Sequence, residues 1–169
     1  MRSFVVDTNV FIDLLLCGRI NQLFMLGWEI HTTQFVLAEL HDAQQETLSG
    51  FAHRPDFRVR SFHFDELEML QGISFQTRSV TRRIADRSVL YLATETQSIL
   101  LTGDRDLRKE ATAHGIPAHG TLWLVQEWVR CSVLTPSEAV TTLFNLKAVN
   151  HRLPQRELTF LIQEYSTMV

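Results

Sequence analysis

The sequence contains little cysteine, proline or glycine: 2 Cys, 4 Pro and 7 Gly in 169 residues. Cys17 and Cys131 lie far apart in apolar segments, so no disulfide framework is indicated and a reducing cytoplasm is the default location. The scarcity of Pro and Gly also excludes a collagen-like or low-complexity chain. No apolar run approaches ~18 residues, and Asp7 interrupts the apolar N-terminal segment. The sequence therefore predicts neither a membrane span nor a signal peptide.

What is present is the composition of an ordinary globular domain, with 45% hydrophobic and 21% charged residues. A chain of 169 residues is long enough to bury a core without disulfides or a structural metal. The 16 basic and 19 acidic residues give a net charge of −3, so the overall charge does not attract nucleic acid. Any contact with nucleic acid must therefore depend on a local basic patch.

Short apolar runs with the pattern of strands alternate with longer segments that have helical periodicity. The predicted strands are residues 3–8, 28–33, 57–64 and 98–103, with a short strand or turn at 116–120. The predicted helices are 34–51, 65–75, 79–97 and 106–115, with one or two helices over 9–27. This alternation predicts an α/β fold with a mostly parallel sheet that helices cover on both faces. From Gly120 onward the pattern is entirely helical. We expect residues 120–169 to form a helical extension that packs on the core formed by residues 1–119.

Four carboxylates are candidates for one site. Asp7 ends the first predicted strand and Asp104 follows the fourth, so both lie at the carboxyl edge of the sheet, where open α/β folds bind ligands. Glu39 lies one turn into the helix after the second strand, and Asp86 lies on the helix before the fourth. Both have aliphatic neighbours, which predicts partial burial.

Four acids without a nearby lysine cannot all ionise side by side without a counter-charge. A divalent cation removes this conflict, and a ligand set made only of oxygens favours a hard ion. The sequence therefore predicts Mg²⁺ or Mn²⁺ as the cofactor.

Four blocks of the sequence resemble the motifs of the PIN-domain family, and they occur in the family's order: DTNVFIDLL, VLAEL, ADRSVLYLA and LLTGDRDLRKEA, the last followed by HGI. They lie between residue 4 and about residue 118. The resemblance implies a three-layer α/β/α sandwich. It also implies the following site residues: an acidic cluster of Asp7, Glu39, Asp86 and Asp104, an auxiliary acid Asp106, and the polar supports Asn9 and Thr102.

The same resemblance implies a function, since PIN domains are small metal-dependent nucleases and many are toxins of toxin–antitoxin pairs. It predicts a Mg²⁺- or Mn²⁺-dependent endoribonuclease with RNA as substrate and an antitoxin protein as partner. Asp7 and Asp104 would be the primary metal ligands, while Glu39 and Asp86 complete the shell or orient the attacking water. Apolar residues at 122–129 and 158–162 further predict a homodimer.

Simpler structural roles compete with these interpretations. Asp7, Asp104 and Asp106 could be helix caps, and Glu39 could face solvent. Asp13 is expected to be a surface residue. Basic residues close to the acids are either a solvated face or contacts to the RNA backbone: Arg82, Arg83, Arg87 and Arg105.

Other functions also stay open at this stage. The chain could be a PIN nuclease without an antitoxin, or a non-catalytic module that binds proteins. A phosphatase with an acid after its first strand would carry a second aspartate where this chain has Asn9. A receiver domain would need a lysine where this chain has Gly103 and Asp104. The seven histidines show no HxxxH or HxxH spacing, which argues against zinc.

Overall fold

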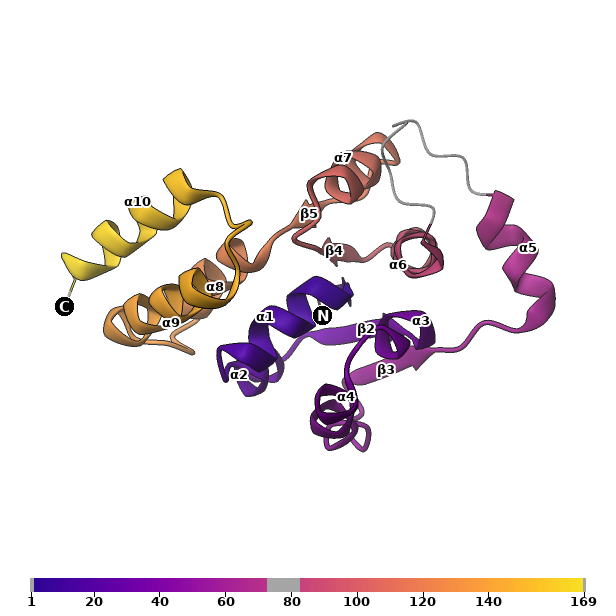
Figure 1. The fold of residues 1–169 in the computed structure, drawn as a ribbon, viewed down its shortest axis with the longest axis horizontal. Helices are drawn as coiled ribbons and strands as arrows, with labels where there is room; N and C mark the ends of the chain where they lie inside the picture. The colour runs from indigo at the N-terminus through magenta and orange to yellow at the C-terminus, as the bar shows by residue number, and fades with distance from the viewer. Residues whose placement is uncertain (1, 73–82, 169) are drawn as a thin grey trace.

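A computed structural model describes residues 2–72 and 83–168 (Figure 1). Its sheet has the strand order β3-β2-β1-β4-β5, and all four neighbouring pairs are parallel. The strands are β1 (Ser3–Val6), β2 (Glu29–Thr33), β3 (Phe57–Arg60), β4 (Ile99–Leu101) and β5 (Ala118–His119). The predicted α/β fold with a predominantly parallel sheet is confirmed.

Ten helices surround this sheet in the described part of the chain. They are α1 (Thr8–Leu16), α2 (Ile20–Met25), α3 (Gln34–Ala38), α4 (Asp42–Ser49), α5 (Phe64–Gly72), α6 (Ile84–Glu95), α7 (Arg105–Ala113), α8 (Thr121–Arg130), α9 (Pro136–Val149) and α10 (Gln155–Ser166). None of these helices, within residues 2–72 and 83–168, has the length and apolar character needed to cross a bilayer.

The helices form layers on the two faces of the sheet. On one face α6 packs against β1, β2 and β4, and the hydroxyls of Ser88 and Thr33 lie 2.8 Å apart. On the other face Phe11 of α1 and Phe24 of α2 pack on Phe57 of β3, with ring centroids 6.4 and 5.5 Å apart. The alternating side chains of each strand thus fill two separate apolar layers, as the three-layer prediction requires.

β1 is the central strand, and this position decides where the site can form. Phe4, Val5 and Val6 are completely buried, because a central parallel strand is covered on both faces. After β1 the chain adds β2 and β3 on one side, then crosses to place β4 on the other side. The strand order therefore reverses at the carboxyl end of β1, directly before Asp7.

Two predicted boundaries were wrong. The single helix predicted for 34–51 is two helices, because Gln44 Oε1 accepts the backbone N–H of His41 at 3.0 Å and starts α4 anew. The predicted strand 57–64 ends at Arg60. There the side chain of Gln34 bonds both the N–H and the C=O of Phe62, at 2.8 and 3.4 Å, in place of a neighbouring strand.

Two further predicted helices extend into residues that the structure does not describe. Arg83 has an extended backbone and precedes α6, so the described part of the helix predicted for 79–97 begins at Ile84. Residues 79–82 of that prediction lie outside the described residues, as do residues 73–75 of the helix predicted for 65–75.

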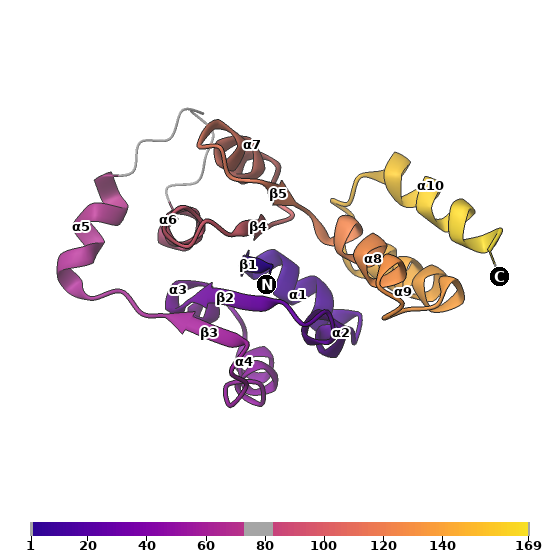
Figure 2. The ribbon, with the colours of Figure 1, turned by 180° about the vertical axis from the view of Figure 1, so that it is seen from behind.

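Helices α8, α9 and α10 gather at one end of the molecule, opposite α5 (Figures 1 and 2). Asp13 of α1 connects them to the core: its carboxylate accepts hydrogen bonds from Thr121 Oγ1 at 2.7 Å and from Asn150 Nδ2 at 3.0 Å. Asp13 is only 4% exposed, so its prediction as a surface residue was wrong. It lies on the buried face of α1 with Val10 and Leu14.

The apolar residues of the extension pack inside the chain. Leu122, Trp128, Leu158 and Leu161 belong to the same buried core as the sheet. Because these side chains are already buried within one chain, they do not by themselves require a second copy. The homodimer stays a prediction.

Candidate active site

Asp7 lies at the carboxyl end of β1, where the strand order reverses. The side chain is 2% exposed, and Oδ1 accepts the backbone N–H of Thr8 at 2.8 Å, so Asp7 is also the N-cap of α1. Burial is the largest influence on this carboxyl group and raises its pKa from 3.8 to about 6, although the hydrogen bonds to its charged form act in the opposite direction. The capping role and a role in the site are therefore compatible.

Thr102 and Asn9 hold the second oxygen of Asp7. Oδ2 accepts Thr102 Oγ1 at 2.7 Å and Asn9 Nδ2 at 2.5 Å. Oδ1 of Asn9 accepts the backbone N–H of Gly103 at 2.5 Å, which ties the turn after β1 to the turn after β4. Both residues predicted as polar supports thus contact Asp7 directly, and they fix its orientation.

Asp104 lies two residues past Thr102 and is the N-cap of α7. Its Oδ1 accepts the backbone N–H groups of Asp106 and Leu107 at 2.8 and 2.9 Å, while its own N–H donates to Thr102 Oγ1 at 3.1 Å. One carboxylate oxygen is therefore held by the start of α7. The other accepts no hydrogen bond within the described chain.

Glu39 lies at the same edge of the sheet, at the end of α3, the short helix that follows β2. It is the C-cap of the short helix α3, and its Oε2 accepts the hydroxyl of Thr8 at 2.7 Å. The side chain belongs to an exposed residue, so Thr8 is what holds it beside β1. The negative charge of Glu39 contributes to the raised pKa of Asp7.

Asp86 lies in the first turn of α6 and is 9% exposed. Its Oδ2 is buried and has no hydrogen-bond partner in the described structure. Burial, followed by the negative charges of Asp7, Asp104 and Glu39, raises the pKa of Asp86 to about 7, and the nearby Arg83 only partly offsets this. Asp7, Glu39 and Asp104 therefore lie close enough to raise the pKa of Asp86.

This arrangement fits a divalent cation by its donor chemistry. An unpartnered, buried carboxylate oxygen among like charges is an unfavourable arrangement that a hard cation would relieve. Across residues 2–72 and 83–168, however, no three His, Cys, Asp or Glu side chains are close enough together to form a metal-binding group. The fit to a cation therefore rests on the oxygen donors and on the unpartnered Oδ2 of Asp86, and not on a complete set of metal ligands in the described residues.

The described auxiliary and basic candidates lie on α6 and α7. Asp106 lies in the first turn of α7, 3.6 Å from Lys109, and Arg105 begins α7 as an exposed residue. Arg83 is the exposed N-cap of α6. Arg87 donates to the carbonyl oxygens of Leu70 and Gln71 at 3.0 and 2.6 Å, so it ties α5 to α6. Arg82 lies outside the described residues.

Sequence patterns did not single out Thr8, the residue that binds Glu39. Its position directly after Asp7, in the first turn of α1, was the available signal, because this position lies at the strand edge that the acids share. The sequence pattern likewise did not indicate a role for Gly103 in the site, beyond showing that a receiver domain's lysine is absent there. A Cβ at this position would lie 3.0 Å from Asn9 Oδ1, so the close approach of Asn9 favours glycine.

Comparisons with known proteins place this geometry in a family. A family model described as a PIN domain matches residues 3–167. Among solved structures, a PilT N-terminus domain protein from the archaeon Sulfolobus solfataricus is 14% identical, with a TM-score of 0.43 over 74% of this chain and 92% of that one. A domain of a functionally unknown protein from Methanocaldococcus jannaschii is 25% identical, with a TM-score of 0.47 over 71% and 91%. No curated protein matches the chain.

The family match extends over nearly the whole chain, and it includes both the acidic edge and the helices α8–α10. The predicted resemblance is therefore confirmed, and the chain belongs to the PIN-domain family.

Proposed function

We propose that this protein is a divalent-metal-dependent endoribonuclease whose active site is the acidic edge formed by Asp7, Glu39, Asp86 and Asp104. The family is generally one of nucleases. The observation that carries the proposal is the buried, unpartnered Oδ2 of Asp86, surrounded by the charges of the other three acids. A purely structural carboxylate in such a place would be expected to have a hydrogen-bond partner.

Mg²⁺ or Mn²⁺ would be held by Asp7, Asp86 and Asp104, with Glu39 as a further ligand or as the group that orients water. The bound ion would supply an activated water and offset the charge on the phosphate oxygens. Asn9 and Thr102 keep the carboxylate of Asp7 in one orientation, so Asp7 loses less conformational entropy when it binds the ion. Thr8 has the same role for Glu39.

The basic residues at the edge suit a polyanionic substrate. Arg83 and Arg105 are exposed at the starts of α6 and α7, the two helices that carry Asp86 and Asp106. Such side chains position a phosphate backbone without reading its sequence. We propose that the substrate is RNA and that the protein acts on it in the cytoplasm. Arg83 and Arg105 would contact the phosphate backbone of the RNA.

The test is cleavage of a structured RNA by purified protein with Mg²⁺, Mn²⁺ or EDTA, beside Asp7→Asn and Asp104→Asn. Asp65→Asn, an exposed acid on α5, is the matched control. We expect metal-dependent cleavage that falls at least ~10²-fold in both site variants and is unchanged in the control. Equal cleavage by all proteins would indicate a contaminant and contradict the proposal.

A second readout does not depend on activity. Mg²⁺ or Mn²⁺ should raise the melting temperature of the wild type and of Asp65→Asn, and should do so far less for Asp104→Asn. No metal-induced rise in the wild type, together with no cleavage, would overturn the acidic site. A non-catalytic binding module would then be the better account.

The toxin role is the narrower part of the proposal. A toxin should stop the growth of cells that express it, and the effect should require the acids. We expect arrest with the wild type and with Asp65→Asn, and normal growth with Asp104→Asn at equal protein levels. Co-expression of a cognate antitoxin should restore growth. Normal growth with an active wild-type enzyme would favour a PIN nuclease that is not a toxin.

A further inference from the structure

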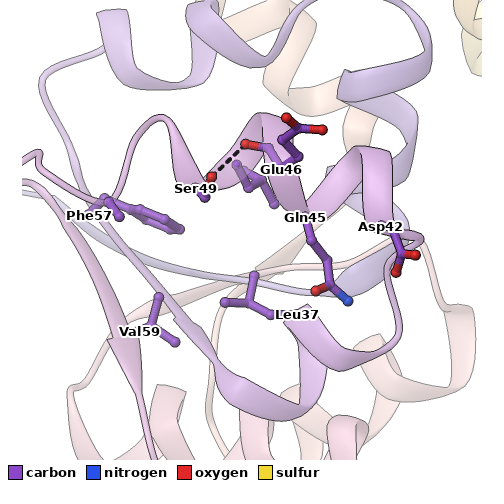
Figure 3. A pocket seen from close by; sticks show the side chains of 9 residues that line it. Leu37, Asp42, Gln45, Glu46, Ser49, Phe57 and Val59 are labelled. Atoms are coloured by element: carbon purple, nitrogen blue, oxygen red, sulfur yellow. Dashed lines mark hydrogen bonds between the residues drawn. The ribbon is translucent and has the colours of Figure 1, made fainter.

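A pocket of ≈460 Å³ lies between α3, α4 and β3, and none of the four acids of the proposed active site lines it (Figure 3). Its apolar lining consists of Leu37, Leu48, Phe57 and Val59. Leu48 and Phe57 are buried core residues, whereas Val59 is 40% exposed although it is a valine in a strand. The apolar side chains are therefore only partly covered by the chain itself.

The pocket lies beside an edge strand of the sheet. β3 is the outermost strand on its side in the described structure, and Val59 points from this strand into the pocket. Ala52 and Ser49, which also line the pocket, are exposed. Small molecules are usually held in clefts that bury most of their surface. An open groove beside an edge strand is better suited to a segment of polypeptide.

One wall of the pocket is acidic. Asp42 and Glu46 are exposed on α4, four residues apart and so on the same side of the helix, with Gln45 beside them (Figure 3). Like charges at this spacing destabilise a helix by a few tenths of a kcal/mol. Neither carboxylate has a salt bridge in the part of the chain that the structure describes. The nearby Arg54 is already engaged, since it bonds both oxygens of Asp56 at 2.9 and 2.7 Å.

We propose that this surface, here called the α4–β3 groove (Leu37, Asp42, Glu46, Ser49, Phe57 and Val59), is a docking site for a cationic amphipathic segment of a partner protein. The segment inserts one or two apolar side chains between α4 and β3 and places Lys or Arg against Asp42 and Glu46. The apolar lining of the groove favours the apolar side chains of the segment, and the carboxylates of Asp42 and Glu46 favour its basic side chains. An acidic or wholly polar segment would satisfy neither.

The probe is a fluorescein-labelled peptide of 12 residues in which Leu and Lys alternate, and its binding is followed by anisotropy. A second peptide with Ser in place of Leu keeps the charge and removes the apolar side chains. Asp42→Asn/Glu46→Gln removes the charge of the groove. Ser49→Trp fills the pocket from an exposed position whose hydroxyl bonds only Glu46 O of its own helix. Asp65→Asn/Glu68→Gln makes the same charge change on α5, away from the groove.

We expect saturable binding of the Leu/Lys peptide, with a dissociation constant on the order of 10–100 µM at low salt. The charge variant should weaken binding about five- to tenfold, and this loss should disappear at ~0.5 M salt. Ser49→Trp should weaken binding at least ~10-fold at either salt concentration. The Ser-containing peptide should bind the wild type as weakly as the Leu/Lys peptide binds Ser49→Trp.

Several results would overturn the proposal. Absence of saturable binding up to ~1 mM would exclude this partner chemistry. Equal losses in Asp65→Asn/Glu68→Gln would mean that the peptide binds acidic surface without regard to the groove. Unchanged binding to Ser49→Trp would mean that the pocket is not entered. A blocked Leu-Lys dipeptide that binds as well as the longer probe would indicate a small-molecule site.

These measurements use no RNA and no metal ion. Their outcome is therefore independent of the nuclease proposal, and either proposal can fail while the other holds. The unfolding transition of each variant serves as the control for folding, since all five substituted positions are exposed.

Discussion

The hydroxyl of Thr8 donates a 2.7 Å hydrogen bond to Oε2 of Glu39, across 31 residues of sequence. It joins the first turn of α1 to the end of α3, and so links the carboxyl ends of β1 and β2. Glu39 is otherwise an exposed side chain with many accessible rotamers. Thr8 therefore determines where one of the four acids stands.

Thr8→Val should reduce RNA cleavage about tenfold while leaving the fold intact. Valine keeps the shape of threonine but cannot donate to Glu39, and one lost hydrogen bond to a charged group corresponds to ~1.5 kcal/mol. Thr8→Ser should retain most activity, because its hydroxyl can still reach the carboxylate. Single-turnover cleavage at saturating Mn²⁺ checks this. Thr112→Val, which removes an exposed hydroxyl from α7, is the control.

Asp86→Asn should stabilise the metal-free protein while it removes cleavage. The carboxylate is buried, has an unpartnered oxygen and lies among three other acids, so replacing it with a neutral isostere relieves repulsion. We expect a gain of about 1–3 kcal/mol in the free energy of unfolding at pH 8 with EDTA. Urea unfolding measures this gain. A loss of stability would mean that Asp86 has a favourable partner.

Gly103→Ala should disturb the site through Asn9. The new Cβ would lie 3.0 Å from Asn9 Oδ1, the atom that accepts the N–H of Gly103, so Asn9 has to move and its bond to Asp7 weakens. We expect cleavage to fall about tenfold, with a loss of ~1 kcal/mol in stability. Gly72→Ala is the matched control, because a Cβ there has no neighbour within 4 Å. Similar kinetics for both variants would show that Asn9 is not needed.

The pH dependence of stability should reveal Asp13. Burial raises the pKa of this carboxyl above 3.8, despite the hydrogen bonds from Thr121 and Asn150. The folded protein then keeps a proton that the unfolded chain has lost, so the stability contribution of Asp13 falls as pH rises from ~4 and levels off above the folded pKa. Asp13→Asn lacks this decline. Urea unfolding from pH 4.5 to 8 should show that the free energy of unfolding of Asp13→Asn rises relative to that of the wild type as pH increases. A difference that does not change with pH would contradict a raised pKa for Asp13.

The acids that follow strands were the predictable part of the site. Asp7 comes directly after the apolar run of β1, and Asp104 comes three residues after the last apolar residue of β4. Parallel strands bring their carboxyl ends to one edge. The start of helix α9 also follows from local sequence, because Thr135 and Glu138 form a capping box with Pro136 in the first turn. In these cases the local sequence and the final packing favour the same structure.

The missed features depend on contacts between distant segments. Asp13 has the same local pattern as a surface acid, and only Thr121 and Asn150, more than 100 residues away, make its burial possible. The break after α3 and the early end of β3 follow from single side chains, Gln44 and Gln34, that bond backbone groups. Propensity and periodicity contain no information about such partners. The lack of a partner for Asp86 Oδ2 is likewise a property of the assembled fold.

The central place of β1 has a consequence for how the protein is made. Asp7 is synthesised before its partner Thr102, which follows 95 residues later in the chain. β1 cannot acquire its second neighbour before β4 exists, so a nascent or truncated chain that ends before Thr102 contains the first acid without the second half of its surroundings. The acidic edge therefore cannot be complete until β4 has been synthesised and has paired with β1.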